Sequence, residues 1–256
     1  VGRIDMNPDG QRINKIPTVL HNAMLHPLQP FPIKGVLWYQ GESNANNDEQ
    51  AAAYRGLFAN LVRSWRSQWS GSEKDFPFLW VQLPGFGSPD SVPPARSAWA
   101  THRESMSAAL ALPNTGQAIA IDLGEANDIH PRNKLDVGAR LARVALRLVY
   151  RNQLVASGPT YRAHAIKDGR VTIEFDNSEG GLVTRRNDGT VGGFAIAGAD
   201  HKLVWADARI DGNRVIVWSD KIPNPVTVRY AWSNNPNTAS LYNREGLPAA
   251  PFRTDK

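Results

Sequence analysis

Three short, continuous apolar runs constrain the fold of this sequence more than any other feature. They occupy residues 35–39, 78–83 and 118–122, and a stretch with helical periodicity separates each run from the next. Apolar runs of this length, without strict alternation of apolar and polar residues, are typical of parallel strands that are buried on both faces. The sequence therefore predicts an α/β domain with a parallel sheet and right-handed crossovers.

Three amphipathic helices are expected around these strands, at residues 48–69, 95–112 and 131–149. Pro131 suits the first turn of the third helix, where a missing N–H costs nothing. Three strands make a thin sheet for a three-layer αβα domain. Residues 1–5 resemble neither a signal peptide nor an initiator sequence, as in a processed or truncated chain. We therefore expect the sheet to be incomplete here and to be completed by strands of an N-terminal segment.

In the second half of the sequence the apolar residues no longer follow a helical spacing. Short β-rich runs lie at residues 171–175, 194–196, 202–206, 214–218 and 226–232. Turns such as Asp168-Gly169, Asp188-Gly189 and Asp211-Gly212 are typical of hairpins. The pattern predicts an antiparallel β-sandwich. We expect the α/β domain to span residues 1–152 and the β-sandwich domain to span residues 153–256.

The composition excludes several classes of site and partner. The sequence has 256 residues, a net charge of +5 and no cysteine, so disulfides, thiol nucleophiles and thiolate metal sites are excluded. No apolar run approaches the roughly 20 residues that cross a bilayer, so we expect no membrane partner. Arg140, Arg143 and Arg147 follow a helical spacing, which indicates a solvated helix face. We therefore expect no nucleic-acid partner.

Two polar motifs lie at or just past the C-terminal ends of predicted strands. They are WYQGESN at residues 38–44 and NDIHP at residues 127–131. Ligands bind at this edge in open α/β sheets. His130 could act there as a general base, because histidine changes charge near physiological pH. Asp128 could orient the His130 ring as the acid of a catalytic triad, or it could cap the following helix.

The first motif offers groups that could stabilise an oxyanion. Gly41 would let a backbone N–H approach a substrate closely. The Asn44 amide could donate a hydrogen bond to a developing oxyanion, or it could cap the helix that starts near Asp48. Ser43 is an alternative nucleophile, but a nucleophile elbow has the pattern Gly-x-Ser-x-Gly and Ala45 replaces its second glycine.

Six segments, taken in order, resemble a known family. They are HNAMLHPL at residues 21–28, PIKG at 32–35, WYQGESN at 38–44, FLWVQLP at 78–84, DIHP at 128–131 and GLPAAPFRTD at 246–255. With them the sequence resembles the C-terminal part of a sialate O-acetylesterase-like carbohydrate esterase of the SGNH (GDSL-type) hydrolase superfamily. The resemblance covers nearly the whole sequence and depends on the ordered set rather than on one motif.

The resemblance implies removal of O-acetyl groups from carbohydrates through an acyl-serine intermediate, without a metal or another cofactor. The family's oxyanion asparagine matches Asn44, and its catalytic histidine matches His130. The family's nucleophile lies in a Gly-Gln-Ser-Asn block, which this sequence lacks. An N-terminal fragment of the same precursor is therefore the expected partner that supplies the serine. A periplasmic or secreted bacterial location is also expected, although no signal peptide is visible.

The acid of the triad has two candidates. The superfamily places an aspartate three residues before the histidine, and Asn127 occupies that position here. Asp128 lies only two residues before His130 and is the favoured acid. Related acetylxylan esterases use a glutamate in the block that corresponds to Glu42, which is the rival acid.

Four further residues are expected to bind substrate. Gln40, Gln82 and Arg132 could hydrogen-bond sugar hydroxyls or an acidic sugar, and Phe86 could stack against a sugar ring. Two other functions stay open: a glycoside hydrolase that uses Glu42 and Asp128 as paired carboxylates, and a non-catalytic carbohydrate-binding fragment. Sialic acid, xylan and xyloglucan are not distinguished as substrates.

Overall fold

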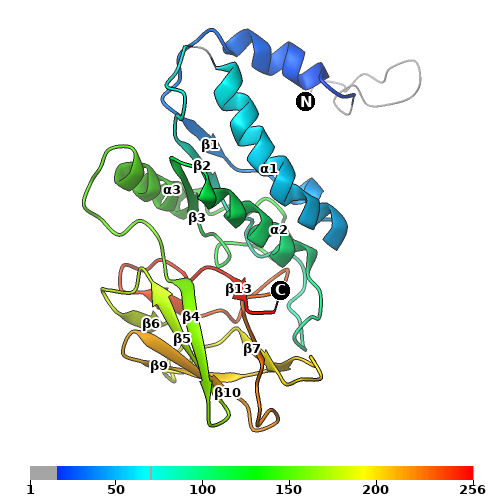
Figure 1. Ribbon diagram of the computed structural model, residues 1–256, viewed down its shortest axis with the longest axis vertical. Coiled ribbons are helices and arrows are strands. Elements are labelled where there is room, and N and C mark those ends of the chain that lie inside the picture. Colours follow the sequence, from blue (N-terminus) through cyan, green and yellow to red (C-terminus); the bar gives the residue numbers. More distant parts are fainter. Residues whose placement is uncertain (1–15, 70, 256) are drawn as a thin grey trace.

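A computed structural model describes residues 16–69 and 71–255 of the chain (Figure 1). It has a mixed α/β fold with several sheets, in which an N-terminal α/β unit lies above an all-β unit in the view of Figure 1. The expectation for residues 1–5 lies outside the described part. No helix in the described part is long and apolar enough to span a membrane.

The α/β unit contains the parallel sheet that the three apolar runs predict. Its strands lie in the order β1 (Val36–Trp38), β2 (Phe78–Val81) and β3 (Thr115–Ala118). The central strand β2 is buried on both faces, because Phe78 and Trp80 pack into one apolar cluster while Leu79 packs into another. Continuous apolar sequence is what such two-sided burial requires.

Three helices cover the two faces of this sheet. They are α1 (Asp48–Gln68), α2 (Ala98–Ser107) and α3 (Lys134–Leu148). Side chains of α1 and α2 share the cluster that contains Phe78, whereas side chains of α3 share the cluster that contains Leu79. Gly116 of β3 lets α3 approach closely, since a Cβ there would lie 2.5 Å from Val144 Cγ1.

Among the predicted boundaries that were wrong, two belong to the third strand and the third helix. The third strand ends at Ala118 instead of running over residues 118–122, because Ile119 and Ile121 leave the sheet and pack into the core of the all-β unit. The third helix begins at Lys134 rather than at Pro131, because the Asn133 side chain accepts a hydrogen bond from the Asp136 N–H at 3.1 Å and caps the helix.

The all-β unit contains two four-stranded antiparallel sheets and a two-stranded one. The first sheet has the order β4 (Thr160–Lys167), β5 (Arg170–Asp176), β10 (Arg214–Trp218) and β9 (Asp207–Asp211). The second has the order β13 (Phe252–Arg253), β11 (Thr227–Tyr230), β7 (Phe194–Ala197) and β8 (Val204–Trp205). The pair is β12 (Leu241–Asn243) with β6 (Leu182–Thr184).

One apolar core joins the two four-stranded sheets. It combines Ile173 of β5 and Val215 of β10 from the first sheet with Ile196 of β7 and Val228 of β11 from the second. The predicted turn at Asp168-Gly169 is confirmed, because both residues have positive φ angles, 49° and 72°, and join β4 to β5.

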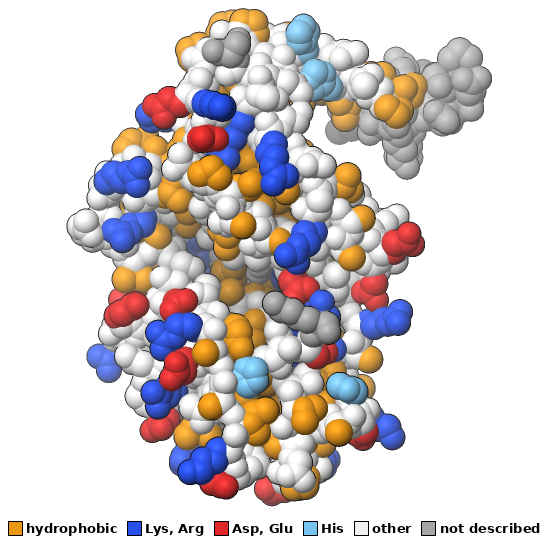
Figure 2. Space-filling view, in the orientation of Figure 1, with side chains coloured by type: hydrophobic (Ala, Val, Ile, Leu, Met, Phe, Trp, Pro, Cys, Tyr) orange, Lys and Arg blue, Asp and Glu red, His pale blue; other side chains and the backbone are white. Residues whose placement is uncertain are grey.

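Charged side chains of both signs are interspersed over the face shown in Figure 2. No three His, Asp or Glu side chains gather to form a metal site within residues 16–69 and 71–255.

Candidate active site

The loops that follow β1 and β3 meet on one small apolar cluster at the carboxyl edge of the parallel sheet. Ala45, from the loop after β1, is buried in this cluster with Leu83 and Trp99. Ile129, from the loop after β3, packs against the same cluster, and so does Phe86 from the loop after β2. The structure therefore brings together the two motifs, which lie about ninety positions apart in the sequence.

Backbone contacts join the second loop directly to the third. The Gly87 N–H donates to the Ala126 carbonyl at 3.1 Å. A Cβ on Gly124 would lie 1.8 Å from the Gly85 carbonyl oxygen, so only glycine permits this approach. The position of the loop that carries His130 is thus tied to the loop after β2.

The first motif forms a short 3₁₀ helix, Glu42–Asn44, that begins after Gly41. Gly41 has a φ angle of 151°, and a Cβ there would lie 2.3 Å from His102 Cε1. The Gly41 N–H donates to Glu42 Oε2 at 2.9 Å. This N–H, which we expected to face a substrate, therefore holds the carboxylate of the rival triad acid.

Asn44 and Ser43 lie on this 3₁₀ helix. The capping alternative for Asn44 is wrong, because Asn47 caps α1 by accepting from the Gln50 N–H at 2.9 Å. Asn44 is half-buried, whereas Ser43 is exposed. No hydrogen bond joins Ser43 to His130 in the described part of the chain. The roles of Asn44 and Ser43 stay predictions.

His130 lies in the third loop, and 85% of its side-chain surface is exposed. Its Nδ1 lies 4.0 Å from Asp128 Oδ1, which is too long for a hydrogen bond. The same Asp128 oxygen accepts from the backbone N–H of His130 at 2.8 Å. The capping alternative for Asp128 is also wrong, because Asn133 caps α3. Asp128 therefore orders the backbone of His130 and lies near its ring.

Arg132 closes the loop that contains His130. Its Nη2 donates to Glu125 Oε2 at 2.8 Å, and its backbone N–H donates to Glu125 Oε1 at 2.8 Å. Hydrogen bonds from Arg132 lower the pKa of Glu125 below its usual value. The positive charge of Arg132 is therefore already paired within the loop.

The other expected substrate-binding residues occupy different environments. Gln40 is half-buried, and its Oε1 accepts from the Tyr54 hydroxyl at 3.3 Å. Gln82 is buried, and its amide donates to Ser107 Oγ at 3.0 Å. Phe86 is half-buried with its ring centroid 5.4 Å from that of Trp99. Of these three, Gln82 lies furthest from solvent.

The sequence did not single out His102, yet this residue supports the first motif. His102 is fully buried on α2, and its ring stacks on Tyr54 with a centroid distance of 4.3 Å. Neither ring nitrogen has a hydrogen-bond partner within residues 16–69 and 71–255. Burial, assisted by the charge of Arg103, lowers the pKa of His102 to about 4. A single histidine on a helix carries no sequence signal that would reveal this role.

Arg103 is the second residue that the sequence did not reveal. It is fully buried, and its guanidinium donates to four carbonyls: Leu83 and Pro84 after β2, and Ser233 and Asn234 after β11. Burial lowers the pKa of Arg103 to about 9. Because its bonds reach both units, Arg103 positions the loop after β2 against the all-β unit.

Comparison with known proteins identifies the class first. A carbohydrate acetylesterase from Xanthomonas citri superposes with a TM-score of 0.88 at 50% sequence identity, over 95% of this chain and 55% of that protein. The chain therefore has an α/β esterase fold. A family profile described as "Carbohydrate esterase, sialic acid-specific acetylesterase" matches residues 10–147, and the chain belongs to that family.

Curated relatives cover the same length of this chain. Sialate O-acetylesterase of Rattus norvegicus is 31% identical over 261 residues, which are 92% of this chain and 46% of the relative. Sialate O-acetylesterase of Pongo abelii is 36% identical over 262 residues, which are 92% of this chain and 48% of the relative. The chain thus spans about half the length of the curated relatives it matches.

Proposed function

We propose that this chain supplies most of the active-site residues of a carbohydrate O-acetylesterase. We propose that the enzyme works in the periplasm or outside a bacterial cell. The observation that carries the proposal is the meeting of two motif loops on the cluster of Ala45, Leu83 and Trp99, at the carboxyl edge of a parallel sheet. Family membership and the names of the relatives support an acetyl ester of a carbohydrate as the substrate.

In the proposed reaction, His130 removes the proton from a serine hydroxyl that a separate segment supplies. The serine oxygen then attacks the acetyl carbonyl carbon, and the Asn44 amide donates a hydrogen bond to the resulting oxyanion. His130 returns the proton to the departing sugar oxygen, which leaves an acyl-serine. His130 then deprotonates a water molecule, which attacks the acyl carbon, and returns that proton to the serine oxygen as acetate leaves. The exposed ring of His130 is free to meet a serine from another segment.

We propose Asp128 as the acid that stabilises protonated His130. A separation of 4.0 Å between Nδ1 and Oδ1 needs only a small side-chain rotation to become a hydrogen bond, and such bonds often tighten only when substrate is present. Glu42 remains the rival, although its carboxylate is bound to the Gly41 N–H.

The docking surface that we propose for the companion segment is the open edge of the sheet. Within the described residues β1 pairs with β2 alone, so its other edge offers unpaired backbone groups. Leu37 of β1 is 67% exposed and Leu135 of α3 is 83% exposed. We propose that a strand and a helix of the N-terminal segment cover this surface and complete a three-layer αβα domain over residues 1–152.

We also propose that residues 153–256 form a β-sandwich domain. The support is the single apolar core that the two four-stranded sheets share.

Reconstitution tests the proposal. The chain is assayed alone and after co-expression with the N-terminal segment that carries Gly-Gln-Ser-Asn, using p-nitrophenyl acetate, O-acetylated sialic acid and acetylxylan. We expect activity only from the pair, acetate release without glycan cleavage, and a loss of kcat of at least about a thousandfold in His130→Ala. His164→Ala, in β4 of the other unit, is the control and should retain activity.

Three outcomes would contradict the proposal. Robust activity of the chain alone that disappears in Ser43→Ala would make Ser43 the nucleophile. Cleavage of an unacetylated glycan that depends on Glu42 and Asp128 would indicate a glycoside hydrolase. Undiminished acetate release by a pair that carries His130→Ala would show that His130 is not the base and would leave this chain only a carbohydrate-binding role.

A further inference from the structure

The first of the six family segments, HNAMLHPL at residues 21–28, takes no part in the proposed active site. In the structure residues 19–28 form one continuous helical segment, which includes the π turn η2 (His21–Leu25) and the 3₁₀ turn η3 (His26–Leu28). This segment projects from the α/β unit at the end of the molecule that is remote from the all-β unit (Figure 1). We refer to residues 19–31 as the arm.

The arm is largely apolar, yet none of its residues is buried. Its large apolar side chains, Leu20, Met24, Leu28 and Phe31, are between 47% and 66% exposed. None of these four side chains packs in the apolar clusters that form the cores of the two units. The position of the arm therefore depends little on the burial of apolar surface.

Polar groups attach the arm to the C-terminal end of α1. The Nε2 of His21 lies 2.7 Å from Gln68 Oε1, and the Gln29 amide donates to the same oxygen at 2.8 Å. At the end of the arm, the Trp69 indole N–H donates to the Phe31 carbonyl at 2.8 Å. Hydrogen bonds therefore hold the polar side of the arm against the rest of the chain.

The exposed apolar side chains of the arm form a stripe. Leu20, Met24 and Leu28 are spaced four positions apart, which is about one helical turn, so they lie one above the other. Their exposure places this stripe on the side that faces solvent. A surface helix normally turns its apolar stripe toward the core and its polar face outward. The arm has the opposite arrangement, and an exposed apolar patch of this kind marks an interaction surface.

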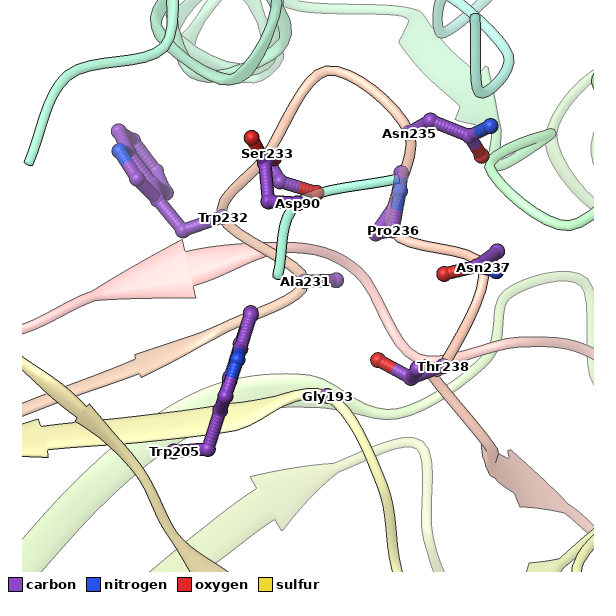
Figure 3. A pocket seen from close by; sticks show the side chains of 10 residues that line it. All are labelled: Asp90, Gly193, Trp205, Ala231, Trp232, Ser233, Asn235, Pro236, Asn237 and Thr238. Carbon is purple, nitrogen blue, oxygen red and sulfur yellow. The ribbon is translucent and has the colours of Figure 1, made fainter. Parts of the chain in front are cut away.

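An exposed apolar residue elsewhere in the molecule, Trp205, provides a contrast. It lines a small pocket together with the polar side chains of Asp90, Asn237 and Thr238 (Figure 3). Its indole N–H donates to the Ser91 carbonyl at 3.0 Å. Single exposed apolar residues are normal on a protein surface and need no partner. The arm differs because its exposed apolar residues follow one another on successive turns.

The arm also lacks charged groups that would suit a membrane. Residues 16–33 contain no Asp, Glu, Lys or Arg. A helix that binds a membrane surface carries Lys and Arg on its polar face, so the arm has no such attraction to anionic lipid. The centre of a protein–protein interface is instead depleted of charged residues and enriched in Met and aromatic residues. The composition of the arm therefore favours a protein partner with an apolar surface.

The relatives indicate which protein covers the arm. The acetylesterase from Xanthomonas citri is matched over 55% of its length and that from Rattus norvegicus over 46%, so about half of each lies outside the region that this chain matches. The arm leads directly into β1, whose open edge carries the exposed Leu37. In Figure 1 the arm and β1 lie at the same end of the α/β unit. A segment that covers the β1 edge therefore lies beside the arm.

We propose that the arm is a docking site for the N-terminal segment, which covers the stripe of Leu20, Met24 and Leu28 with apolar side chains of its own. This inference rests on the proposed function, because that function requires the segment. Contact at the arm as well as at the β1 edge fixes the orientation of the segment, on which the position of its serine depends.

Charge substitutions in the stripe test the inference. The tagged full chain is co-expressed with the N-terminal segment that carries Gly-Gln-Ser-Asn, and the dissociation constant of the purified pair is measured by analytical ultracentrifugation. We expect Met24→Glu and Leu28→Glu each to weaken the pair at least about a hundredfold, because each places a charge in an apolar contact. Met24→Leu keeps the contact apolar and should bind as the wild-type chain does.

Ile166→Glu is the matched control, because Ile166 is 45% exposed but lies on β4 of the all-β unit. It should leave the pair intact. None of Met24, Leu28 and Ile166 packs in an apolar cluster, so each glutamate variant of the chain alone should keep the wild-type melting temperature. A loss of pairing without a loss of stability separates docking from folding.

A photo-crosslinking residue at position 24 identifies the occupant of the stripe. Irradiation of the pair should join the arm to the N-terminal segment. A product that contains two copies of this chain would instead assign the stripe to a homodimer and overturn the inference.

Pairing that Met24→Glu and Leu28→Glu do not weaken would also overturn it. That outcome leaves the proposed function untouched, because acetate release is measured separately. Failure of the wild-type chain to bind the segment at all would overturn both. Pairing through the arm without acetate release would contradict the proposed function alone.

Discussion

At the scale of single residues, His102 and Gly41 form the contact on which the first motif rests. Gly41 is the residue that lets the 3₁₀ helix of Glu42 and Asn44 lie directly on the His102 ring. A larger residue at position 41 would push this motif away from α2. Two predictions follow from this contact, one for each partner.

His102 should make the stability of the chain depend on pH. Its folded pKa of about 4 lies below the unfolded value of 6.5, so the unfolded state takes up the proton first as the pH falls. The stabilisation is complete above pH 6.5 and is lost progressively down to about pH 4, and the loss at pH 4.5 is about 2–3 kcal/mol. Denaturant unfolding at pH 7 and pH 4.5 measures it.

The variant His102→Leu should flatten this pH dependence, whereas His164→Leu, whose ring bonds to the Tyr161 hydroxyl, should retain it. Identical pH profiles for the wild-type chain and His102→Leu would show that another group controls acid stability.

Replacing Gly41 by alanine should destabilise the chain by about 1–3 kcal/mol, because the new Cβ meets His102 at 2.3 Å and alanine disfavours a φ angle of 151°. Gly138→Ala is the control: a Cβ there meets nothing within 4 Å, and alanine in a helix should stabilise by about 0.5–1 kcal/mol. Thermal unfolding measures both. An unchanged melting temperature in Gly41→Ala would mean that the motif does not rest on the histidine.

At the scale of elements, Arg103 of α2 makes several hydrogen bonds to the loop after β2. Arg103 binds the carbonyls of three buried residues, Leu83, Pro84 and Ser233, and shares the Asn234 carbonyl with the Phe86 N–H. Both glycines that contact the third loop, Gly85 and Gly87, belong to the loop that Arg103 holds. The placement of His130 therefore depends indirectly on a helix that carries none of the predicted site residues.

Arg103→Met should destabilise the chain by about 3–5 kcal/mol, since it leaves the carbonyls of three buried residues, Leu83, Pro84 and Ser233, unpaired. Arg147→Met is the control, because Arg147 is exposed on α3 and donates only to Gln153. Urea unfolding followed by tryptophan fluorescence gives both values. A loss below about 1 kcal/mol in Arg103→Met would indicate that water replaces the guanidinium.

Some elements could be predicted from the sequence and others could not. Strand β2 was predicted because burial on both faces requires a continuous apolar run, and helix α1 because its one buried face gives apolar residues a helical period. Strand β4 was missed because all of its residues are exposed or half-buried, which leaves no alternation of buried and exposed positions to detect. The end of β3 was misplaced because an apolar run looks the same whether it packs in one core or crosses to the next.

At the scale of the whole molecule, the two units share structure across their boundary. Ile119 and Ile121 of the α/β unit pack in the core of the all-β unit. Arg253 of β13 pairs with Glu104 of α2 at 2.8 Å, and Arg229 of β11 donates to the Ala95 carbonyl at 3.0 Å. These contacts make separate unfolding of the two units costly.

The full chain should therefore unfold in one cooperative transition, although the first half of its sequence has an α/β pattern and the second half a β-rich pattern. Far-ultraviolet circular dichroism and tryptophan fluorescence should give coincident denaturant curves. Two separated transitions, or a fragment of residues 153–256 that melts at the same temperature as the full chain, would contradict this coupling.

The sequence by itself determined the local features: the buried strands of the sheet, the amphipathic helices, the turn at Asp168-Gly169 and the two polar motifs. These features follow from periodicity and from the chemistry of neighbouring residues, which act over a few positions of the chain. The ordered motifs also determined the family, which the family profile confirms.

Only the tertiary structure decided which distant groups meet. It brought Ala45 and Ile129 onto one cluster, put His102 beneath Gly41, and stacked Arg185 on the Tyr242 ring next to Asp122. Such contacts depend on loops whose course is set by backbone hydrogen bonds and by buried arginines, and no local pattern in the sequence records them. Arg132 is a further example: the sequence suggested that its charge could bind an acidic sugar, but in the structure this charge is paired with Glu125, seven positions away.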